Sequence, residues 1–297
     1  MLNIESIHAA ELRTAVAAAR EAGEAVRDLY DRAAAETYIK GDGSPVTDAD
    51  LLADKLIRAR LGAAFPDDAL LTEEGVDDEA RLGSPRVWIV DPIDGTAQFV
   101  ARSGEFDVLI ALAVEGRLVV GVLLHPPTGR WLAAADGAGA WVGEGERIER
   151  FSLRAVPAGS QPRIATSVWL GAPGSLPALG RVSGRLGAAP PTVSDLGVYL
   201  RHLAPPDNAI DALVGLSPAD RPTMAWEWDF AAADIVAHEA GGRFTDVRGN
   251  RFVYNKRLPR NEGGLLMSVD PTTHGRILEA LRPELAREWG PRIGLRP

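Results

Sequence analysis

The stretch Val87-Trp88-Ile89-Val90-Asp91-Pro92-Ile93-Asp94-Gly95-Thr96 decides how this chain is organised. Its first four residues are apolar and mostly β-branched or aromatic, which predicts a buried strand. Because Pro92 cannot donate a hydrogen bond to a sheet, we expect the strand to end near Asp91. Gly95 and Thr96 then predict a turn and the N-cap of a helix.

This turn presents two carboxylates beside a predicted helix start. Asp91 and Asp94 offer the oxygen ligands that hard cations such as Mg²⁺ prefer. Backbone N–H groups at a helix start favour an anion such as phosphate. Together these features indicate a site for phosphoryl transfer. The alternative is an ordinary turn, because Asp-Pro and Asp-Gly are common turn dipeptides. Only the rest of the chain separates the two interpretations.

The composition fits one large globular domain or two of ordinary size, because the chain has 297 residues and 46% of them are hydrophobic. The net charge of -9 argues against a nucleic-acid polymer as partner, since such a partner needs a basic face. The absence of cysteine excludes thiol chemistry and disulfides and fits a cytoplasmic protein. The longest apolar region, 108–124, is interrupted by Glu115-Gly116-Arg117, so we expect no membrane span.

The first half of the chain predicts two helices followed by a mainly antiparallel sheet. Apolar residues at helical spacing predict helices over 9–32 and 48–64, the second capped by Thr47 or Asp48. The strands expected after them are, in order, 69–72, 87–90, 107–114, 118–124, 130–135 and 140–142. The chain turns polar around 144–151, where we place the boundary between an N-terminal half, 1–148, and a C-terminal half, 149–297.

The second half alternates predicted strands and helices. Its clearest helix follows Trp226, with Asp229 as the expected N-cap and Gly241-Gly242 as the left-handed C-cap. The remaining expected elements are strands over 163–167, 243–246 and 264–269, helices over 176–186 and 274–281, and shorter pieces at 193–203 and 209–216. The whole pattern predicts a mixed α/β protein.

Acidic residues stand at four strand ends or helix starts: Asp50, Glu73, the Asp91/Asp94 pair and Asp229. Layered α/β proteins build their sites at such positions. Each residue also has a structural alternative. Asp50 and Asp229 could do no more than cap a helix or favour its dipole, and Glu73 could lie in a solvated acidic loop.

Four motifs in order resemble those of the inositol monophosphatase superfamily. Residues 88–99 resemble its first signature and residues 228–242 its second, while Val46-Thr47-x-x-Asp50 and Glu73-Glu74 match its two upstream acidic motifs. The resemblance covers nearly the whole chain. It implies a layered αβαβα sandwich, with an N-terminal α+β half and a C-terminal α/β half. It also implies two or three Mg²⁺ ions per site, sensitivity to lithium and a homodimer.

The resemblance assigns roles by position. It implies metal ligands at Glu73, Asp91, Ile93 (through its carbonyl), Asp94 and Asp229. It implies Asp50, Thr96 and Glu73 as the residues that prepare the attacking water. It implies contacts to a small phosphorylated substrate from Asp94, Gly95, Thr96, Asp229 and Lys256. Two metal ions roughly 3.5–4 Å apart can activate a water and stabilise the leaving oxygen of an in-line displacement.

Other phosphatase chemistries fit the residues less well. Aspartyl-phosphate enzymes use Asp-x-Asp, whereas Asp91 and Asp94 are separated by two residues, one of them Pro92. The five histidines are scattered, so they predict neither a metal centre nor a phosphohistidine site. No Walker loop is present, which argues against an NTP-driven machine.

The substrate is less well determined by the sequence. Gly104-Glu105-Phe106 and Tyr254-Asn255-Lys256 are similar to the 3′(2′),5′-bisphosphate nucleotidase branch, which converts phosphoadenosine phosphate to AMP, and this is the leading prediction. Thr166-Ser167-Val168-Trp169 replaces that branch's Ser-Arg-Ser-His-like stretch, and Gly197 stands near a usual lysine, so donors for a second phosphate are lost. The basic residues that could compensate are Arg201, Arg221 and Lys256.

Two alternatives remain open at this stage. One is a phosphatase for inositol 1-phosphate or another sugar phosphate. The other, from a different class, is a non-catalytic protein that binds a phosphate ligand.

Overall fold

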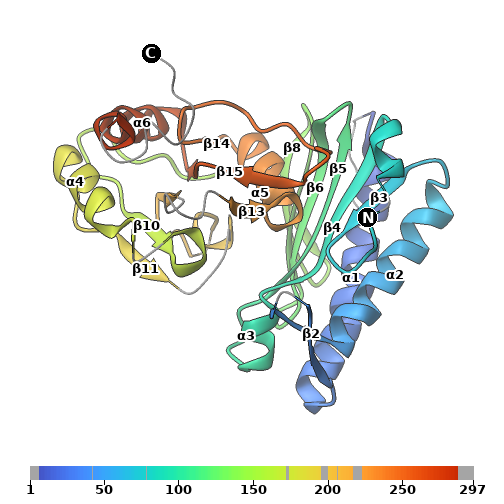
Figure 1. Ribbon diagram of the computed structural model, residues 1–297. Helices are drawn as coiled ribbons and strands as arrows, with labels where there is room; N and C mark the ends of the chain where they lie inside the picture. The colour runs from blue at the N-terminus through green and yellow to red at the C-terminus, as the bar shows by residue number, and fades with distance from the viewer. Residues whose placement is uncertain are drawn as a thin grey trace. The chain divides into compact units, whose positions relative to one another are not determined.

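The computed structural model shows a mixed α/β protein, which confirms the predicted class (Figure 1). The residues that it describes are 7–41, 43–77, 79–171, 174–194, 200–205, 207–216 and 223–286. The chain forms two compact units, and they are not consecutive halves of the sequence. The first unit comprises Met1–Phe151, Glu227–Glu239 and Val253–Pro259, and the second comprises Ser152–Trp226, Ala240–Phe252 and Arg260–Pro297. The linear division at residue 148 stays a prediction.

A seven-stranded sheet forms the centre of the first unit, with its strands in sequence order. These strands are β3 (Ala69–Thr72), β4 (Arg86–Asp94), β5 (Asp107–Val114), β6 (Arg117–His125), β7 (Arg130–Ala135), β8 (Gly139–Glu144) and β9 (Arg147–Phe151). Only β3 and β4 are parallel; every other neighbouring pair is antiparallel. The sheet is therefore mainly antiparallel, as short hairpin connections predicted.

Helices cover both faces of this sheet (Figure 1). The pair α1 (Ala9–Arg32) and α2 (Asp48–Ala64) packs on one face, because each helix buries a stripe of Leu, Ile, Val and Ala against it. The other face carries α5 (Glu227–Glu239), which lies so close to β6 that a Cβ on Gly121 would come within 2.8 Å of the Ala232 carbonyl oxygen. The first unit thus has three layers.

The second unit contains a five-stranded mixed sheet with two helices packed together on it. Its strand order is β11 (Thr192–Ser194), β10 (Ile164–Ser167), β12 (Ala212–Gly215), β16 (Leu265–Ser268) and β14 (Arg243–Asp246). The helices are α4 (Leu176–Leu186) and α6 (Pro271–Glu284). Glu284, fully buried on α6, pairs with Arg181 and Arg185 of α4, which compensates the cost of burying its charge.

Shorter elements complete the chain. Two small antiparallel pairs are β1 (Thr37–Ile39) with β2 (Pro45–Thr47), and β13 (Thr223–Trp226) with β15 (Arg260–Glu262). The short helices are α3 (Thr96–Val100), η1 (Ala80–Gly83), η2 (Val168–Leu170) and η3 (Leu200–His202). In the part of the chain that is described, no helix combines the length and the apolar character needed to cross a membrane.

The expectation that the central strand ends near Asp91 is wrong, because β4 continues to Asp94. The pairing with β5 shifts register here: Asp91 lies opposite Leu109 and Asp94 opposite Asp107. Pro92 falls in this bulge, where the ladder does not need its missing N–H. The next position was also misjudged, because Gly95, with φ at +97°, is the N-cap of α3 and Thr96 is its first residue.

One further expectation is corrected, and one strand was not predicted. Asp229 is not an N-cap, because α5 begins at Glu227 and places Asp229 in its first turn. The polar segment 147–151, where the sequence predicted no strand, is β9, which pairs with β8 at the edge of the sheet. Its side chains are mostly exposed, so its composition resembles that of a loop.

Candidate active site

The parallel pair β3 and β4 places two predicted ligands side by side. Thr72 lies opposite Val90, and the N–H of Glu73 donates to the Val90 carbonyl at 3.1 Å. Glu73 therefore lies next to Asp91, directly after the end of β3 and close to the end of β4. The carboxyl ends of parallel strands meet at one edge of a sheet, and sites in α/β proteins commonly form there.

The bulge in β4 orients the next two carboxylates. Asp91 is buried, and its Oδ1 accepts a hydrogen bond from the Ile93 N–H at 3.0 Å, which fixes the turn around Pro92. Asp94 follows at the end of the strand and is half-buried. Gly95 then adopts the left-handed conformation that starts α3, which few residues with a side chain would tolerate.

Asp50 lies in the first turn of helix α2, where its side chain takes part in the N-terminal cap. The Asp50 Oδ2 accepts from the Thr47 N–H at 2.8 Å and from the Thr47 hydroxyl at 2.5 Å. This reciprocal capping box fixes the carboxylate and leaves Oδ1 for another partner. That partner is the Thr96 hydroxyl at 2.9 Å. The capping role and the functional role of Asp50 therefore coexist.

The Thr96 hydroxyl lies between two acceptors. Its oxygen is 2.9 Å from Asp50 Oδ1 and 3.1 Å from the Ile93 carbonyl oxygen. A hydroxyl has one hydrogen to donate and two lone pairs that accept. Burial raises the pKa of Asp50 above its ordinary value, although the hydrogen bonds from Thr47 and Thr96 favour its charged form.

Helix α5 brings the last predicted acid, Asp229, into reach of the others. Burial raises the pKa of Asp91 well above its usual range, and the negative charges of Glu73, Asp94 and Asp229 raise it further. Three carboxylates, those of Glu73, Asp94 and Asp229, thus surround the buried Asp91 within the first unit. Such a cluster is costly unless it binds protons or cations.

A cation of the chain itself lies at this cluster. The Lys40 ammonium, from the turn between β1 and β2, is 2.7 Å from Glu73 Oε1 and 2.6 Å from Glu74 Oε1. Burial by itself would lower the pKa of Lys40, but the charges of Glu73 and Glu74 raise it above its ordinary value. Burial also raises the pKa of Glu74 to about 7. No feature of the sequence singled out Lys40 as a site residue.

The donor set fits Mg²⁺. All the predicted ligands are oxygen atoms, four from carboxylates and one from the Ile93 carbonyl, without nitrogen or sulfur, and hard divalent cations prefer this set. Among the described residues, no group of three or more acidic or histidine side chains is arranged so that it could already hold a metal ion. Side-chain adjustment around Glu73, which now pairs with Lys40, is therefore needed for the full set to coordinate an ion.

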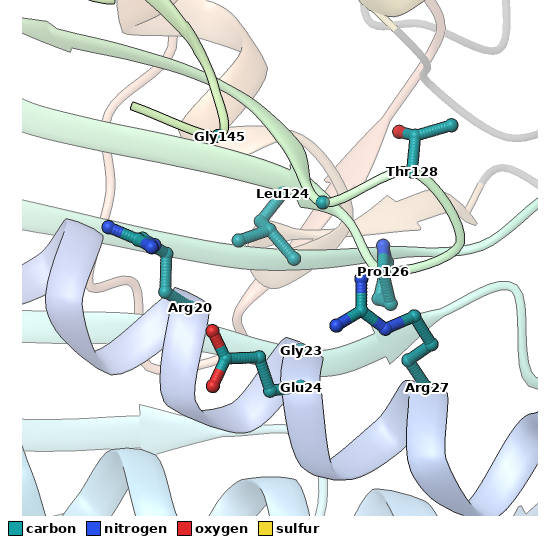
Figure 2. A pocket seen from close by; sticks show the side chains of 9 residues that line it. Arg20, Gly23, Glu24, Arg27, Leu124, Pro126, Thr128 and Gly145 are labelled. Atoms are coloured by element: carbon teal, nitrogen blue, oxygen red, sulfur yellow. The ribbon is translucent and has the colours of Figure 1, made fainter. Parts of the chain in front are cut away.

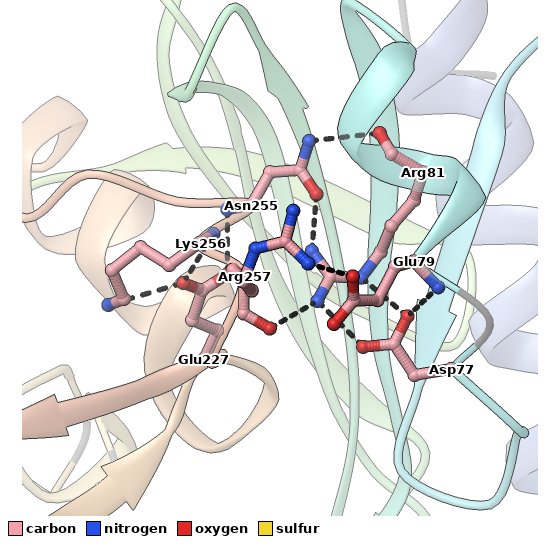
Figure 3. A network of polar contacts seen from close by, with 7 residues as sticks. All are labelled: Asp77, Glu79, Arg81, Glu227, Asn255, Lys256 and Arg257. Carbon is pink, nitrogen blue, oxygen red and sulfur yellow. Dashed lines mark hydrogen bonds and ion pairs between the residues drawn. The ribbon is translucent and has the colours of Figure 1, made fainter.

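Lys256, predicted to contact substrate, lies in a network of polar contacts at the start of α5 (Figure 3). Its ammonium is 3.2 Å from Glu227 Oε1, and its own N–H donates to the same oxygen at 3.2 Å. The side chain remains one-third exposed. Glu227, fully buried, was not singled out in the sequence, since nothing there distinguished it from other helix-start acids.

The residues invoked for substrate choice are described only in part. Gly197 and Arg221 lie outside the described residues. Val168 and Trp169 are exposed on η2 of the second unit, and Arg201 belongs to η3 of the same unit. Their predicted roles stay predictions.

A pocket of about 210 Å³ lies elsewhere in the first unit, between α1 and the turns of the sheet (Figure 2). Arg20 and Arg27 flank it, and Gly23 and Leu124 form part of its wall. None of the predicted site residues lines it. It is therefore separate from the carboxylate cluster.

Comparison with known proteins gives one family and several relatives. The family model described as "Inositol monophosphatase family" matches residues 8–285. A histidinol-phosphatase of Chlorobaculum parvum is 31% identical over 82% of this chain and 88% of its own length. A 3′(2′),5′-bisphosphate nucleotidase CysQ of Aggregatibacter actinomycetemcomitans is 30% identical over 83% of this chain and 88% of its own. The crystal structure of CysQ from Bacteroides thetaiotaomicron superimposes with a TM-score of 0.71 at 27% identity, covering 87% of this chain and 97% of that one.

Proposed function

Because this chain belongs to the inositol monophosphatase family and is a phosphoric monoester hydrolase, we propose that it uses Mg²⁺ to hydrolyse a small phosphate monoester with water. One observation carries the proposal: Glu73, Asp94 and Asp229 gather around the buried Asp91, beside the bonded pair Asp50 and Thr96. The proposed metal ligands are these four acids and the Ile93 carbonyl.

The side chains of the site have separate roles in the proposed reaction. Bound Mg²⁺ would supply Lewis acidity, which lowers the pKa of water and offsets the charge of the phosphate. Thr96 donates its only hydrogen to Asp50, so its oxygen can accept a hydrogen from the attacking water. That contact turns a lone pair of the water toward phosphorus, and Asp50 and Glu73 favour loss of its proton. The N–H groups of Gly95 and Thr96, with Asp94, Asp229 and Lys256, would bind the substrate.

The best candidate substrate is a 3′(2′),5′-bisphosphate nucleotide. The CysQ relatives support it, as do the Gly104-Glu105-Phe106 and Tyr254-Asn255-Lys256 motifs. Lys256 would offer one cation to the second phosphate. The loss of basic side chains at Val168 and Gly197 argues in the other direction.

A second candidate is histidinol phosphate, because the histidinol-phosphatase relative is just as similar to this chain. This substrate carries an amine and an imidazole and no second phosphate. A pocket that is poor in basic groups suits it better than it suits a bisphosphate. Inositol 1-phosphate, which the sequence left open, is the third candidate.

Phosphate release with Mg²⁺ separates these candidates. The purified enzyme is offered 3′-phosphoadenosine 5′-phosphate, histidinol phosphate and inositol 1-phosphate in parallel, with Asp94→Asn as the control for contaminating phosphatase. A kcat/KM highest for the nucleotide supports the first candidate, and a higher value for either monophosphate rejects it. No release from any ester, together with metal-independent ligand binding, would favour the non-catalytic alternative.

Lithium inhibition, dimerisation and a cytoplasmic location are proposals from the family resemblance. Inhibition is measured by titrating LiCl into the phosphatase assay at limiting Mg²⁺. Multi-angle light scattering gives the mass in solution, which should be twice the 31.6 kDa of one chain. A mass of one chain would reject the homodimer.

A further inference from the structure

Three side chains of the first unit join two segments that carry proposed metal ligands (Figure 3). Arg81 belongs to η1, on the segment that follows Glu73. Glu227 opens α5, two positions before Asp229. Asn255 bonds to both Arg81 and Glu227. We call Arg81, Asn255 and Glu227 the brace.

The Arg81 end of the brace is buried and specific in geometry. The Arg81 side chain is 2% exposed, and its guanidinium holds both oxygens of Asp77 at 3.0 and 2.7 Å. Its Nη1 donates to Asn255 Oδ1 at 2.6 Å, while Asn255 Nδ2 donates to the Arg81 carbonyl at 3.1 Å. Because the amide of Asn255 both accepts and donates, its orientation is fixed. A buried guanidinium held in this bidentate way resists displacement.

At the other end of the brace, the Glu227 carboxylate accepts hydrogen bonds from two successive backbone N–H groups. Asn255 N–H donates to Glu227 Oε2 at 2.7 Å, and Lys256 N–H donates to Oε1 at 3.2 Å. Asn255 has φ at +61°, and in this left-handed conformation consecutive N–H groups converge on one anion. Asparagine adopts the conformation more readily than most residues with a side chain.

The brace acts on α5 at the turn that carries Asp229. Side chains two positions apart on a helix do not face each other, so Glu227 can hold the Asn255 segment while Asp229 contributes its charge at Asp91. Through Asn255 and Arg81 the same turn is tied to the segment that begins at Glu73. We propose that Arg81, Asn255 and Glu227 are positioning residues that hold Asp229 and Glu73 in register for metal binding, an inference that rests on the proposed function.

Direct binding of Mn²⁺ to the metal-free full chain tests the proposal. Free Mn²⁺ is counted by electron paramagnetic resonance, so the readout does not depend on turnover. Asn255→Gly keeps the left-handed backbone and both N–H groups and removes only the bonds to Arg81. We expect its Mn²⁺ affinity to fall about tenfold, the low end of the loss seen when groups that support metal ligands are removed. The Mg²⁺ concentration for half-maximal phosphatase activity should rise by the same factor.

Arg257→Gln is the matched control on the same segment. Arg257 pairs with Glu79, but both side chains are largely exposed, and an exposed ion pair contributes little. Its Mn²⁺ affinity should equal that of the wild type. Glu227→Gln, which keeps the shape of the side chain and removes its charge, should weaken Mn²⁺ binding more than Asn255→Gly does.

Wild-type Mn²⁺ affinity in both Asn255→Gly and Glu227→Gln would overturn the proposal, even if their melting temperatures fell, because the brace would then serve stability alone. Failure of the proposed function has a different signature. The wild type would bind Mn²⁺ and release no phosphate from any ester, and the comparison of Mn²⁺ affinities would still decide whether the brace positions the ligands.

Discussion

At the scale of the residue, Asp50 shows how one carboxylate can cap a helix and serve a site. Its Oδ2 takes both donors of Thr47, and its Oδ1 takes the Thr96 hydroxyl. The cap is what fixes the direction of Oδ1. A sequence that places Thr, two residues and Asp at a helix start therefore carries functional as well as structural information.

Thr96→Val should lower kcat by about 100-fold or more, the range expected for loss of a group in proton transfer. Valine keeps the shape of threonine and removes the hydroxyl that links Asp50 to the water. Thr96→Ser keeps the hydroxyl and should recover most of the rate. Steady-state kinetics at saturating Mg²⁺ checks both, and a Thr96→Val enzyme as fast as the wild type would contradict the role.

Asp94→Asn should abolish turnover with little loss of fold, because it removes a ligand charge and keeps the side-chain shape. Phosphate release gives the first quantity and circular dichroism through the melting transition the second. If Asp94→Asn is unfolded under the conditions of the assay, Mn²⁺ binding by Asp229→Asn tests the metal role instead. The Mn²⁺ affinity of that variant should be lower than that of the wild type. An active Asp94→Asn enzyme would refute the metal assignment.

At the scale of the element, α5 sits against the sheet only because β6 has a glycine beneath it. A Cβ at Gly121 would lie 2.4 Å from Ile235 Cγ2 and 2.8 Å from the Ala232 carbonyl oxygen. The glycine is needed for space, since its φ is not in the left-handed range. The close approach brings the start of α5, and so Asp229, to the end of β4.

Gly121→Ala should lower the free energy of unfolding by about 1–3 kcal/mol, the usual cost of overpacking a core. Gly62→Ala is the matched control, because its Cβ meets nothing within 4 Å on helix α2. That change should raise the free energy of unfolding by about 0.5–1 kcal/mol through helix propensity. Denaturation by urea measures both, and equal stability of the two variants would contradict the close packing.

Local pattern was a good guide to elements that bury one face. The helices expected over 9–32, 48–64 and 176–186 and the strands expected over 69–72 and 243–246 have the predicted bounds. It failed where tertiary pairing overrides composition. Strand β9 is polar because it lies at an edge, and β4 passes through Pro92 because a bulge in its pairing with β5 accommodates a residue without an N–H.

At the scale of the whole molecule, the carboxylate cluster makes the free energy of unfolding depend on pH and on bound metal. Burial raises the pKa of Glu74 to about 7, and the pKa of Asp91 is raised well above its usual range. A raised pKa in the folded state contributes stability that is complete below the unfolded value and is lost as pH rises through the folded value. The metal-free protein should therefore lose this contribution on going from about pH 4.5 to pH 7.

Glu74→Gln should gain stability relative to the wild type as pH rises from about 4.5 to 7, and the difference should level off above 7. Melting temperatures in EDTA across this range provide the measurement. His274, whose pKa burial lowers to about 4, changes stability in the opposite direction, but both proteins contain it and it cancels. A difference that is independent of pH would contradict the raised pKa of Glu74.

The family, the α/β class and the list of acids follow from the sequence, because four motifs in order carry all five proposed metal ligands. Short-range chemistry is sufficient for that: a strand that ends in Asp-Pro-Ile-Asp-Gly-Thr and a helix that starts with Thr-x-x-Asp are local patterns.

Which of these groups come into contact depends on the tertiary fold. The Lys40 contact with Glu73, the packing of α5 in the first unit and the brace of Arg81, Asn255 and Glu227 all join residues distant in the sequence. No local pattern encodes these contacts, because they depend on the pairing of strands and, for α5, on the space that Gly121 leaves for the helix. The ligands could be read from the chain, but the contacts that hold them in place follow from packing.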